Sequence, residues 1–279
     1  SVRWCVSAID DAERADARRT LAHALYLIEG ALTDLGDPRA AEYEGRSVAI
    51  YRELGDHLGM GHALLNMGVN AVHRGELDRA VDLYEQAREA LRTAGHVIGL
   101  AHVSLNLGEV LADQGRLDEA ESFLKDARRA ASASQYRMIN AAAQSALGRI
   151  EVRRGGFDKG LELLEAAEAT FEEMKATSWM VETSARIAES LAFAGRFDEA
   201  LAAIDDAMAI ESEAATGGIV PLLERSRARA LAGLGRHDEA RSALERSAAR
   251  ATADGADLEL ALTLQELAHL AASERERAD

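Results

Sequence analysis

The sequence is poor in residues that interrupt helices, fill bulky cores or cross-link chains. Only two of its 279 residues are proline, so long uninterrupted helices are allowed almost everywhere. Aromatic residues make up 4% and apolar residues 48%, which predicts a sizeable core built from small aliphatic side chains. The single cysteine, Cys5, excludes an intrachain disulfide and is typical of a reducing, cytoplasmic compartment.

Positive charge and long apolar runs are also scarce. The 48 acidic residues outnumber the 32 basic ones, for a formal charge of −16. Such a surface repels phosphate groups, so we expect neither nucleic acid nor an anionic membrane as a partner. No stretch approaches the roughly 18 apolar residues of a membrane-spanning helix, and no signal peptide is visible. Alternating runs of β-branched residues are missing too, so the composition indicates an all-α protein.

What the sequence has instead is a short phrase that returns every 40 residues. GELDRA at 75–80 is followed by GRLDEA at 115–120, GGFDKG at 155–160, GRFDEA at 195–200 and GRHDEA at 235–240. The glycine can take the left-handed conformation that ends one helix. The acidic residue suits the N-terminus of the next helix, which is the positive end of its dipole. Small residues at 68 and 80, and at the equivalent positions, let two helices cross closely. This periodicity predicts stacked helix–turn–helix units.

Two helices of about 17 residues fit each period. We predict first helices over 12–34, 57–74, 97–114, 137–154, 177–194, 218–233 and 256–273. Second helices are predicted over 38–53, 77–94, 117–134, 157–174, 197–214 and 237–253. We interpret residues 1–11 as a junction to an upstream segment, 12–273 as the repeat array and 274–279 as a polar tail. The final helix lacks a partner and is expected to cap the stack.

The segments LNMGVNAVHRGELDRAVDLYEQA and LNLGEVLADQGRLDEAESFLKDA resemble tetratricopeptide (TPR) repeats. They share a small residue, a turn glycine and an alanine five positions beyond it. The resemblance extends over residues 35–273, although the period exceeds the usual length of about 34 residues and the consensus tryptophan and tyrosine are missing. It implies a right-handed α-solenoid of about six repeats and a C-terminal capping helix, with first helices lining the concave side.

A looser resemblance concerns the setting of the array. RSVAIYRELGD and the two segments above are similar to the C-terminal arrays of large bacterial, actinobacterial-type regulators. In those proteins a TPR array follows an ATPase module that is joined to a nucleotide cyclase or a LuxR-type helix-turn-helix domain. The resemblance implies a regulatory or sensor arm of a signalling protein. This chain has neither a cyclase nor an ATPase motif, and a free-standing adaptor is the alternative.

When the first helices are aligned by the 40-residue period, equivalent positions form columns. Polar residues gather in columns that are four, three and four positions apart, and this spacing places them on one face of the first helices. Asparagine amides can clamp a peptide backbone, and arginines offer forked donors to carboxylates. We therefore predict a concave groove for an acidic or extended segment of a protein or peptide, including an intramolecular segment of the parent. A solvated face balanced by glutamates such as Glu182 and Glu266 is the main alternative. The candidate residues are His62, Asn66, His102, Asn106, Glu109, Arg149, Arg153, Arg186, Glu189, Arg225 and Arg229.

Other signals carry less weight. GDHLGMG at 55–61 lacks the preceding strand of a phosphate loop, and His62 with His102 supplies too few ligands for a metal. No nucleophile–base–acid set appears, so we expect no catalysis by this chain, no cofactor and no metal. Arg227 interrupts an apolar column, which we interpret as a weaker repeat. Two further functions stay open: a scaffold for homo-oligomers, and a small-ligand receptor that relays a signal to a neighbouring domain.

Overall fold

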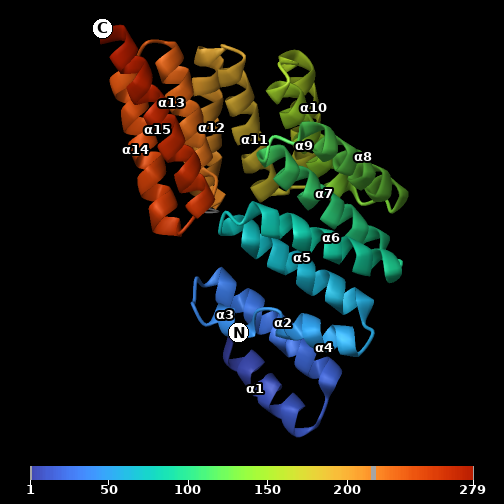
Figure 1. The fold of residues 1–279 in the computed structure, drawn as a ribbon. Coiled ribbons are helices and arrows are strands. Elements are labelled where there is room, and N and C mark those ends of the chain that lie inside the picture. The colour runs from blue at the N-terminus through green and yellow to red at the C-terminus, as the bar shows by residue number, and fades with distance from the viewer. Residues whose placement is uncertain (1, 215–217, 279) are drawn as a thin grey trace. The chain divides into compact units, whose positions relative to one another are not determined.

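The computed structural model describes residues 2–214 and 218–278, and within these ranges every regular element is a helix (Figure 1). The chain divides into two compact units, unit 1 ending at Tyr136 and unit 2 beginning at Arg137. In each unit, helices that follow one another along the chain pack as pairs. Each unit is thus a segment of an all-α solenoid.

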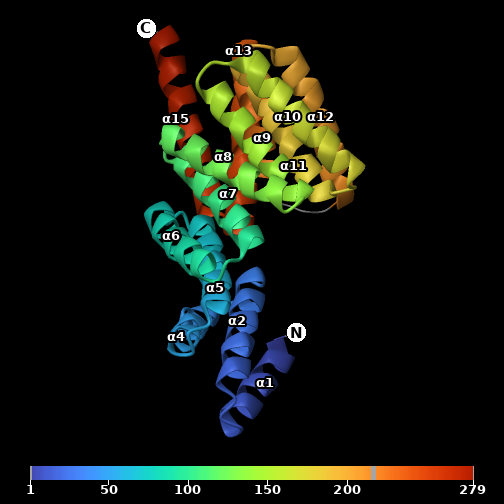
Figure 2. The ribbon, with the colours of Figure 1, turned by 90° about the vertical axis from the view of Figure 1, so that its right-hand side faces the viewer.

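Unit 1 begins with α1 packed against α2, as Figure 2 shows. Its first helices, named by their place in the repeat, are α2 (Arg18–Asp34), α5 (His57–His73) and α7 (Val97–Asp113). The helices that alternate with them are α1 (Val2–Arg14), the short pair α3 (Ala40–Tyr43) and α4 (Arg46–Glu53), α6 (Leu77–Thr93) and α8 (Leu117–Ala133).

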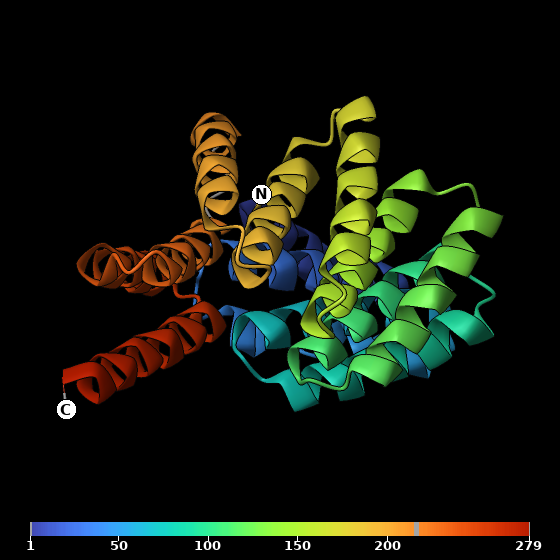
Figure 3. The ribbon, with the colours of Figure 1, turned by 90° about the horizontal axis from the view of Figure 1, so that it is seen from above.

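Unit 2 repeats the same alternation (Figure 3, yellow-green to red). Its first helices are α9 (Arg137–Arg153), α11 (Thr177–Phe193), α13 (Val220–Gly233) and α15 (Asp257–Ala278). Its second helices are α10 (Phe157–Glu173), α12 (Phe197–Ala214) and α14 (His237–Asp254). From residue 57 to residue 254, every predicted helix end lies within two residues of the observed one, which confirms the repeat assignment.

The N-terminal predictions are wrong in two places. The helix predicted over 12–34 is two helices, because Asp16 takes a left-handed conformation (φ 50°) and reverses the chain between α1 and α2. The helix predicted over 38–53 is broken between α3 and α4, where Gly45 has a φ of 72°. The segment 1–11, interpreted as a junction, therefore contains most of a helix. At the other end, α15 continues to Ala278, so the predicted tail is helical up to that residue.

The turn between first and second helices has the same hydrogen bonds in each repeat. At Gly75, which has a φ of 72°, the glycine N–H donates to the Val72 carbonyl and the Glu76 N–H to the Ala71 carbonyl, both at 2.9 Å. These two bonds satisfy carbonyls at the end of α5, as in a Schellman motif. A side chain at Gly75 would be strained in this conformation, which explains why glycine returns here.

Close helix crossings explain the small residues inside the helices. A Cβ atom added to Gly68 would lie 2.4 Å from Cε1 of Tyr84 on the partner helix α6. In the fourth repeat, an added Cβ at Gly148 or at Gly160 would lie 2.9 Å from the other glycine's carbonyl oxygen. Contact this close between backbones requires residues without side chains, as the sequence predicted.

Within each unit, successive first helices also contact one another. In unit 1, α2 touches α5 and α5 touches α7; in unit 2, α9 touches α11, which touches α13, which touches α15. A second helix that follows one first helix and precedes another in its unit contacts both of them, and second helices show no comparable contact with one another in the described parts of the chain. The first helices therefore form one continuous face of each unit, which we call the first-helix face.

Candidate functional site

Two asparagines occupy equivalent positions on the first-helix face of unit 1. Asn66 on α5 donates from Nδ2 to the Tyr26 hydroxyl at 3.0 Å, across to α2. Asn106 on α7 hydrogen-bonds the hydroxyl of Tyr84, whose side chain is buried. Burial and the Glu109 carboxylate raise the pKa of Tyr84, so this hydroxyl stays protonated. Each amide is thus held by a tyrosine while the side chain remains half-exposed.

Histidines and aromatic rings lie one turn away on the same helices. His62 packs edge-on against His96, with ring centroids 5.2 Å apart, and His102 stacks on Tyr136 at 5.6 Å. Burial lowers the pKa of His62, and His96 adds to this while Asp56 opposes it. Burial likewise lowers the pKa of His102, with smaller contributions from His62 and His96. Both imidazoles are therefore neutral at pH 7.

A pocket of about 380 Å³ opens beside this row, between α2, α4 and the start of α5. The aromatic rings of His23, Tyr26, Tyr51 and His62 contribute to its wall. Leu58 and Gly59 extend the apolar surface, while Arg19 and Asp56, paired at 3.6 Å, supply its charges, so the pocket is apolar with one charged edge. Its volume falls in the range of small-ligand and side-chain pockets, about 300–1,000 Å³.

The local structure explains why these side chains gather. Asp56 and His96 cap their helices, since their side chains accept from the N–H groups of Gly59 (2.9 Å) and Gly99 (3.1 Å). An added Cβ at Gly59 would lie 2.5 Å from the Tyr51 ring, and one at Gly99 2.6 Å from His96 Nδ1. Gly59 of GDHLGMG thus accommodates a ring and Gly99, its equivalent in the next repeat, accommodates a helix cap, which agrees with interpreting the motif as repeat spacing.

Two arginines of the predicted row in unit 2, Arg186 and Arg225, are paired with carboxylates. Arg186 and Arg225 are buried, with 8% and 7% of their surface exposed. Arg186 bonds Glu182 one turn earlier on α11, and Arg225 reaches Glu259 on α15 at 2.5 Å. Each of these two charges is therefore neutralised by a glutamate of unit 2.

Arg229 combines an ion pair with an aromatic contact. It bonds Glu266 on α15 and lies 3.9 Å from the centroid of the Phe193 ring. Among the other predicted residues, Glu109, Arg149 and Glu189 are half-buried and Arg153 is exposed. The pairs with Glu182 and Glu266 agree with the alternative of a face balanced by glutamates, and the use of the row for a ligand stays a prediction.

Several residues of the unit 1 site were not among the candidates. Tyr26 occupies the column of Asn66 and Asn106 one period earlier, so the column could have identified it. His96 and Tyr136 occupy the same helix-cap column as Asp56. Whether their rings reach the first-helix face depends on the geometry of the preceding turn. Tyr51 comes from the short helix α4, and the sequence carries no periodic signal for its position.

Across residues 2–214 and 218–278, no group of three or more His, Cys, Asp or Glu side chains is arranged to hold a metal ion. In the same ranges, none of the helices combines the length and the apolar character that crossing a bilayer demands.

Comparison of sequences identifies the repeats. One model of the tetratricopeptide repeat family matches residues 99–173, and a second matches residues 61–86, 188–206 and 221–246. The matched segments lie in both units and contain all five turn phrases in full. The sequence has no significant match among curated proteins.

Similar solved structures share the fold at low sequence identity. A Rap protein complexed with Competence and Sporulation Factor has a TM-score of 0.65 and 14% identity, with 93% of this chain and 76% of that one covered. The Rap conjugation gene regulator of plasmid pLS20, in complex with the Phr* peptide, has a TM-score of 0.64 and 14% identity over 95% and 76%.

A third similar structure is a Signal Transduction ATPase with Numerous Domains from Pyrococcus horikoshii, which carries a tetratricopeptide repeat sensor. It has a TM-score of 0.63 and 13% identity, with 92% of this chain and 41% of that one covered. These likenesses and the family models agree with the 40-residue helix pairs and their left-handed turn glycines. The chain therefore belongs to the tetratricopeptide repeat family.

Proposed function

We propose that the first-helix face of unit 1 binds an extended peptide segment of a protein partner. The observation that carries this proposal is the pair Asn66 and Asn106, each held by a tyrosine hydroxyl and half-exposed on neighbouring helices. A primary amide has two N–H donors and a carbonyl acceptor, and the tyrosine bond engages only part of this capacity. The remainder suits the alternating N–H and C=O groups of a peptide backbone.

The adjacent pocket provides a place for a side chain of the same peptide. His23, Tyr26, Tyr51 and His62 offer ring surfaces, which suit an aromatic or aliphatic residue. The neutral state of His62 and His102 removes positive charge from this face, so a neutral peptide segment fits better than an acidic one. The Rap regulator with bound Phr* peptide is a precedent for peptide binding on a similar fold.

Selection from a random peptide display library tests the proposal. Peptides selected on the wild-type chain should bind at least tenfold more weakly to the double variant Asn66→Ala/Asn106→Ala, because the backbone clamp is lost. Isothermal titration with the selected peptides provides the measurement. The matched control is Gln86→Ala on α6, an exposed amide that bonds the Asp82 carbonyl of its own helix. Equal affinity for the wild type and the double variant would contradict the site.

We also propose that the chain acts as the sensor arm of a larger signalling protein. The ATPase with a tetratricopeptide repeat sensor supports this setting, and so does the resemblance to cyclase- and ATPase-linked arrays. Recovery of the complete reading frame is the test. A cyclase, ATPase or helix-turn-helix domain upstream is the expected result, whereas an initiator methionine directly before Ser1 would make the chain a free-standing adaptor.

A further inference from the structure

Unit 2 contains a charged cluster where the preceding repeats place uncharged side chains. Arg227 on α13 occupies the column that holds Met67, Leu107, Leu147 and Ile187 in the preceding repeats. Glu224, one turn earlier, is buried with 7% of its surface exposed, and its column holds Leu, Ser, Gln and Ser in those repeats. Two charged residues at core-facing positions are costly unless they serve a purpose or find partners.

The cluster has internal partners that hold its geometry. Arg246 on α14 binds Glu224 with two parallel bonds, Nε to Oε1 and Nη2 to Oε2, both 2.8 Å. Arg227 donates from Nη2 to Asp205 Oδ1 on α12 at 2.7 Å, and its Nε lies 3.8 Å from Glu224 Oε2. The buried Glu224 thus draws both guanidinium groups towards the junction of α12, α13 and α14.

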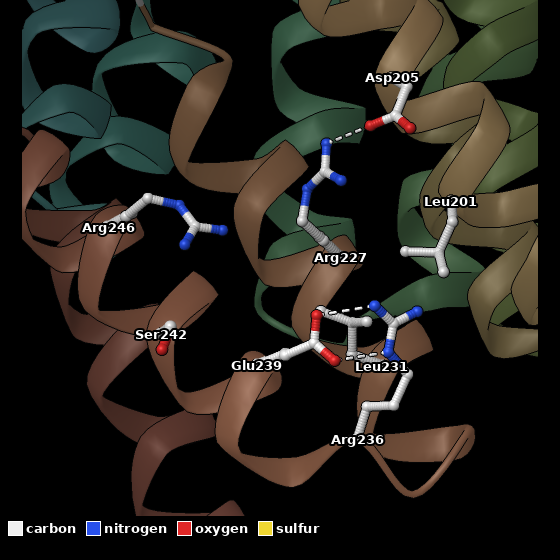
Figure 4. Close-up of a pocket in the computed structure, with 8 residues that line it drawn as sticks. All are labelled: Leu201, Asp205, Arg227, Leu231, Arg236, Glu239, Ser242 and Arg246. Carbon is white, nitrogen blue, oxygen red and sulfur yellow. Dashed lines mark hydrogen bonds and ion pairs between the residues drawn. The ribbon is translucent and has the colours of Figure 1, made fainter.

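These arginines line a pocket of about 340 Å³ (Figure 4). Leu201 and Leu231 contribute apolar surface, and Ser242 adds a hydroxyl. Arg236, at the start of α14, is the third arginine of the lining and is paired with Glu239 at 2.7 Å. In Figure 4 the Arg227 guanidinium points to Asp205 and that of Arg236 to Glu239, while Arg246 lies on the other side of Arg227.

The pocket keeps most of its donor capacity. A guanidinium has five N–H donors, and the bonds above engage one on Arg227 and two on each of Arg236 and Arg246. The carboxylates of Asp205 and Glu239 are largely exposed, at 68% and 57%. Exposed ion pairs contribute little, about 0–1 kcal/mol, so an incoming anion can displace these two carboxylates.

We propose that this pocket binds a small organic anion with two or more carboxylate or phosphate groups. Forked guanidinium donors match both kinds of oxyanion, and Leu201 and Leu231 accommodate the carbon skeleton between the charged groups. The site is independent of the peptide face of unit 1. It also gives Arg227 a role other than that of a residue weakening its repeat.

Isothermal titration of the full chain with citrate and with pyrophosphate, each at constant ionic strength, tests the proposal. At least one of the two should bind with a Kd below 1 mM, and Arg227→Leu should weaken that binding at least tenfold. The variant restores the apolar residue of the column, so it should fold and melt at or above the wild-type temperature. Preference for citrate or for pyrophosphate distinguishes a carboxylate from a phosphate ligand.

A matched pair of variants separates the pocket from general surface charge. Arg236→Gln should weaken binding, whereas Arg196→Gln should leave it unchanged. Arg196 forms the same type of pair, with Glu199 three residues later at 2.6 Å, but lies outside the pocket lining. Equal losses in the two variants, unaltered binding by Arg227→Leu, or no binding of either anion at 10 mM would each overturn the proposal.

Discussion

Glu29 is an acidic residue at a position of α2 that water hardly reaches. Only 6% of its surface is exposed. Burial raises the pKa of its carboxyl to about 7, and the Glu44 carboxylate adds to the effect, while the Gly45 N–H and Arg74 lower it. A carboxyl with this pKa changes its charge within the physiological range, unlike an ordinary glutamic acid at about 4.3.

The raised pKa predicts that the folded chain loses stability as the pH rises. Below the unfolded-state pKa, Glu29 is protonated in both states and has no effect. Between that value and about 7 the unfolded state ionises first, so the free energy of unfolding falls. Glu29→Gln should therefore stabilise the chain by about 1–3 kcal/mol at pH 8 and change little at pH 4.5. Chemical denaturation at the two pH values measures this.

The exposed residue Glu42 supplies the control. Glu42→Gln should alter the free energy of unfolding by less than about 0.5 kcal/mol at either pH. A gain for Glu29→Gln that is the same at pH 4.5 and pH 8 would show that ionisation of Glu29 has no part in the effect.

At the scale of the helix pair, the distance between α5 and α6 depends on Gly68. An added Cβ would overlap the buried Tyr84 ring, whereas an added Cβ at Gly30 of α2 meets nothing within 4 Å. Both glycines lie inside helices, where alanine is intrinsically better by about 0.5–1 kcal/mol. Gly30→Ala should therefore raise the free energy of unfolding by that amount.

Gly68→Ala should lower it by about 1–3 kcal/mol, because the tyrosine must move and the close crossing is lost. Thermal and urea denaturation of the two variants provide the comparison. If Gly68→Ala stabilised the chain as much as Gly30→Ala, the contact between the two helices would not depend on the missing side chain.

The helix pairs were predictable because glycine marks the turn from first to second helix in each copy of the phrase. The turns from a second helix to the next first helix were harder to predict. They use Gly55, Gly95 and Gly255 but also non-glycine residues with positive φ. Asp16 is one of these, and the apolar periodicity around it continues without a visible break. For that reason one helix was predicted where α1 and α2 occur.

The candidate site was predictable only where it follows the 40-residue columns. Those columns led to Asn66, Asn106 and the two histidines beside them. They could not reveal that Arg186 and Arg225 are buried against glutamates, because burial depends on how neighbouring helices pack. Nor could they assign a use to Arg227, because its partner Asp205 lies on another helix and the packing of the two helices decides the contact.

At the scale of the whole molecule, the division after Tyr136 predicts two independently folding pieces. Each unit has its own set of packed helix pairs, and repeat arrays are stabilised mainly by contacts between neighbours. Fragments 1–136 and 137–279 should each give a helical circular dichroism spectrum and a cooperative melting transition.

A fragment 1–115 is the informative comparison, because it removes α8 and leaves the buried side of α7, including Leu107 and Leu111, without its partner. It should melt well below fragment 1–136. Fragments 1–136 and 137–279 that both remain unfolded, while the full chain folds, would show that the two units depend on each other for stability.

The fixed spacing of the turns has a consequence for how such a chain changes its length. Turn glycines recur at 75, 115, 155, 195 and 235. Two points of the chain that are 40 residues apart are therefore equivalent positions in consecutive helix pairs. Recombination between copies of the gene at such points adds or removes one complete pair and leaves every other helix in phase. The array can therefore grow or shrink in whole steps during evolution, with its end surfaces preserved and its length adjusted to the partner.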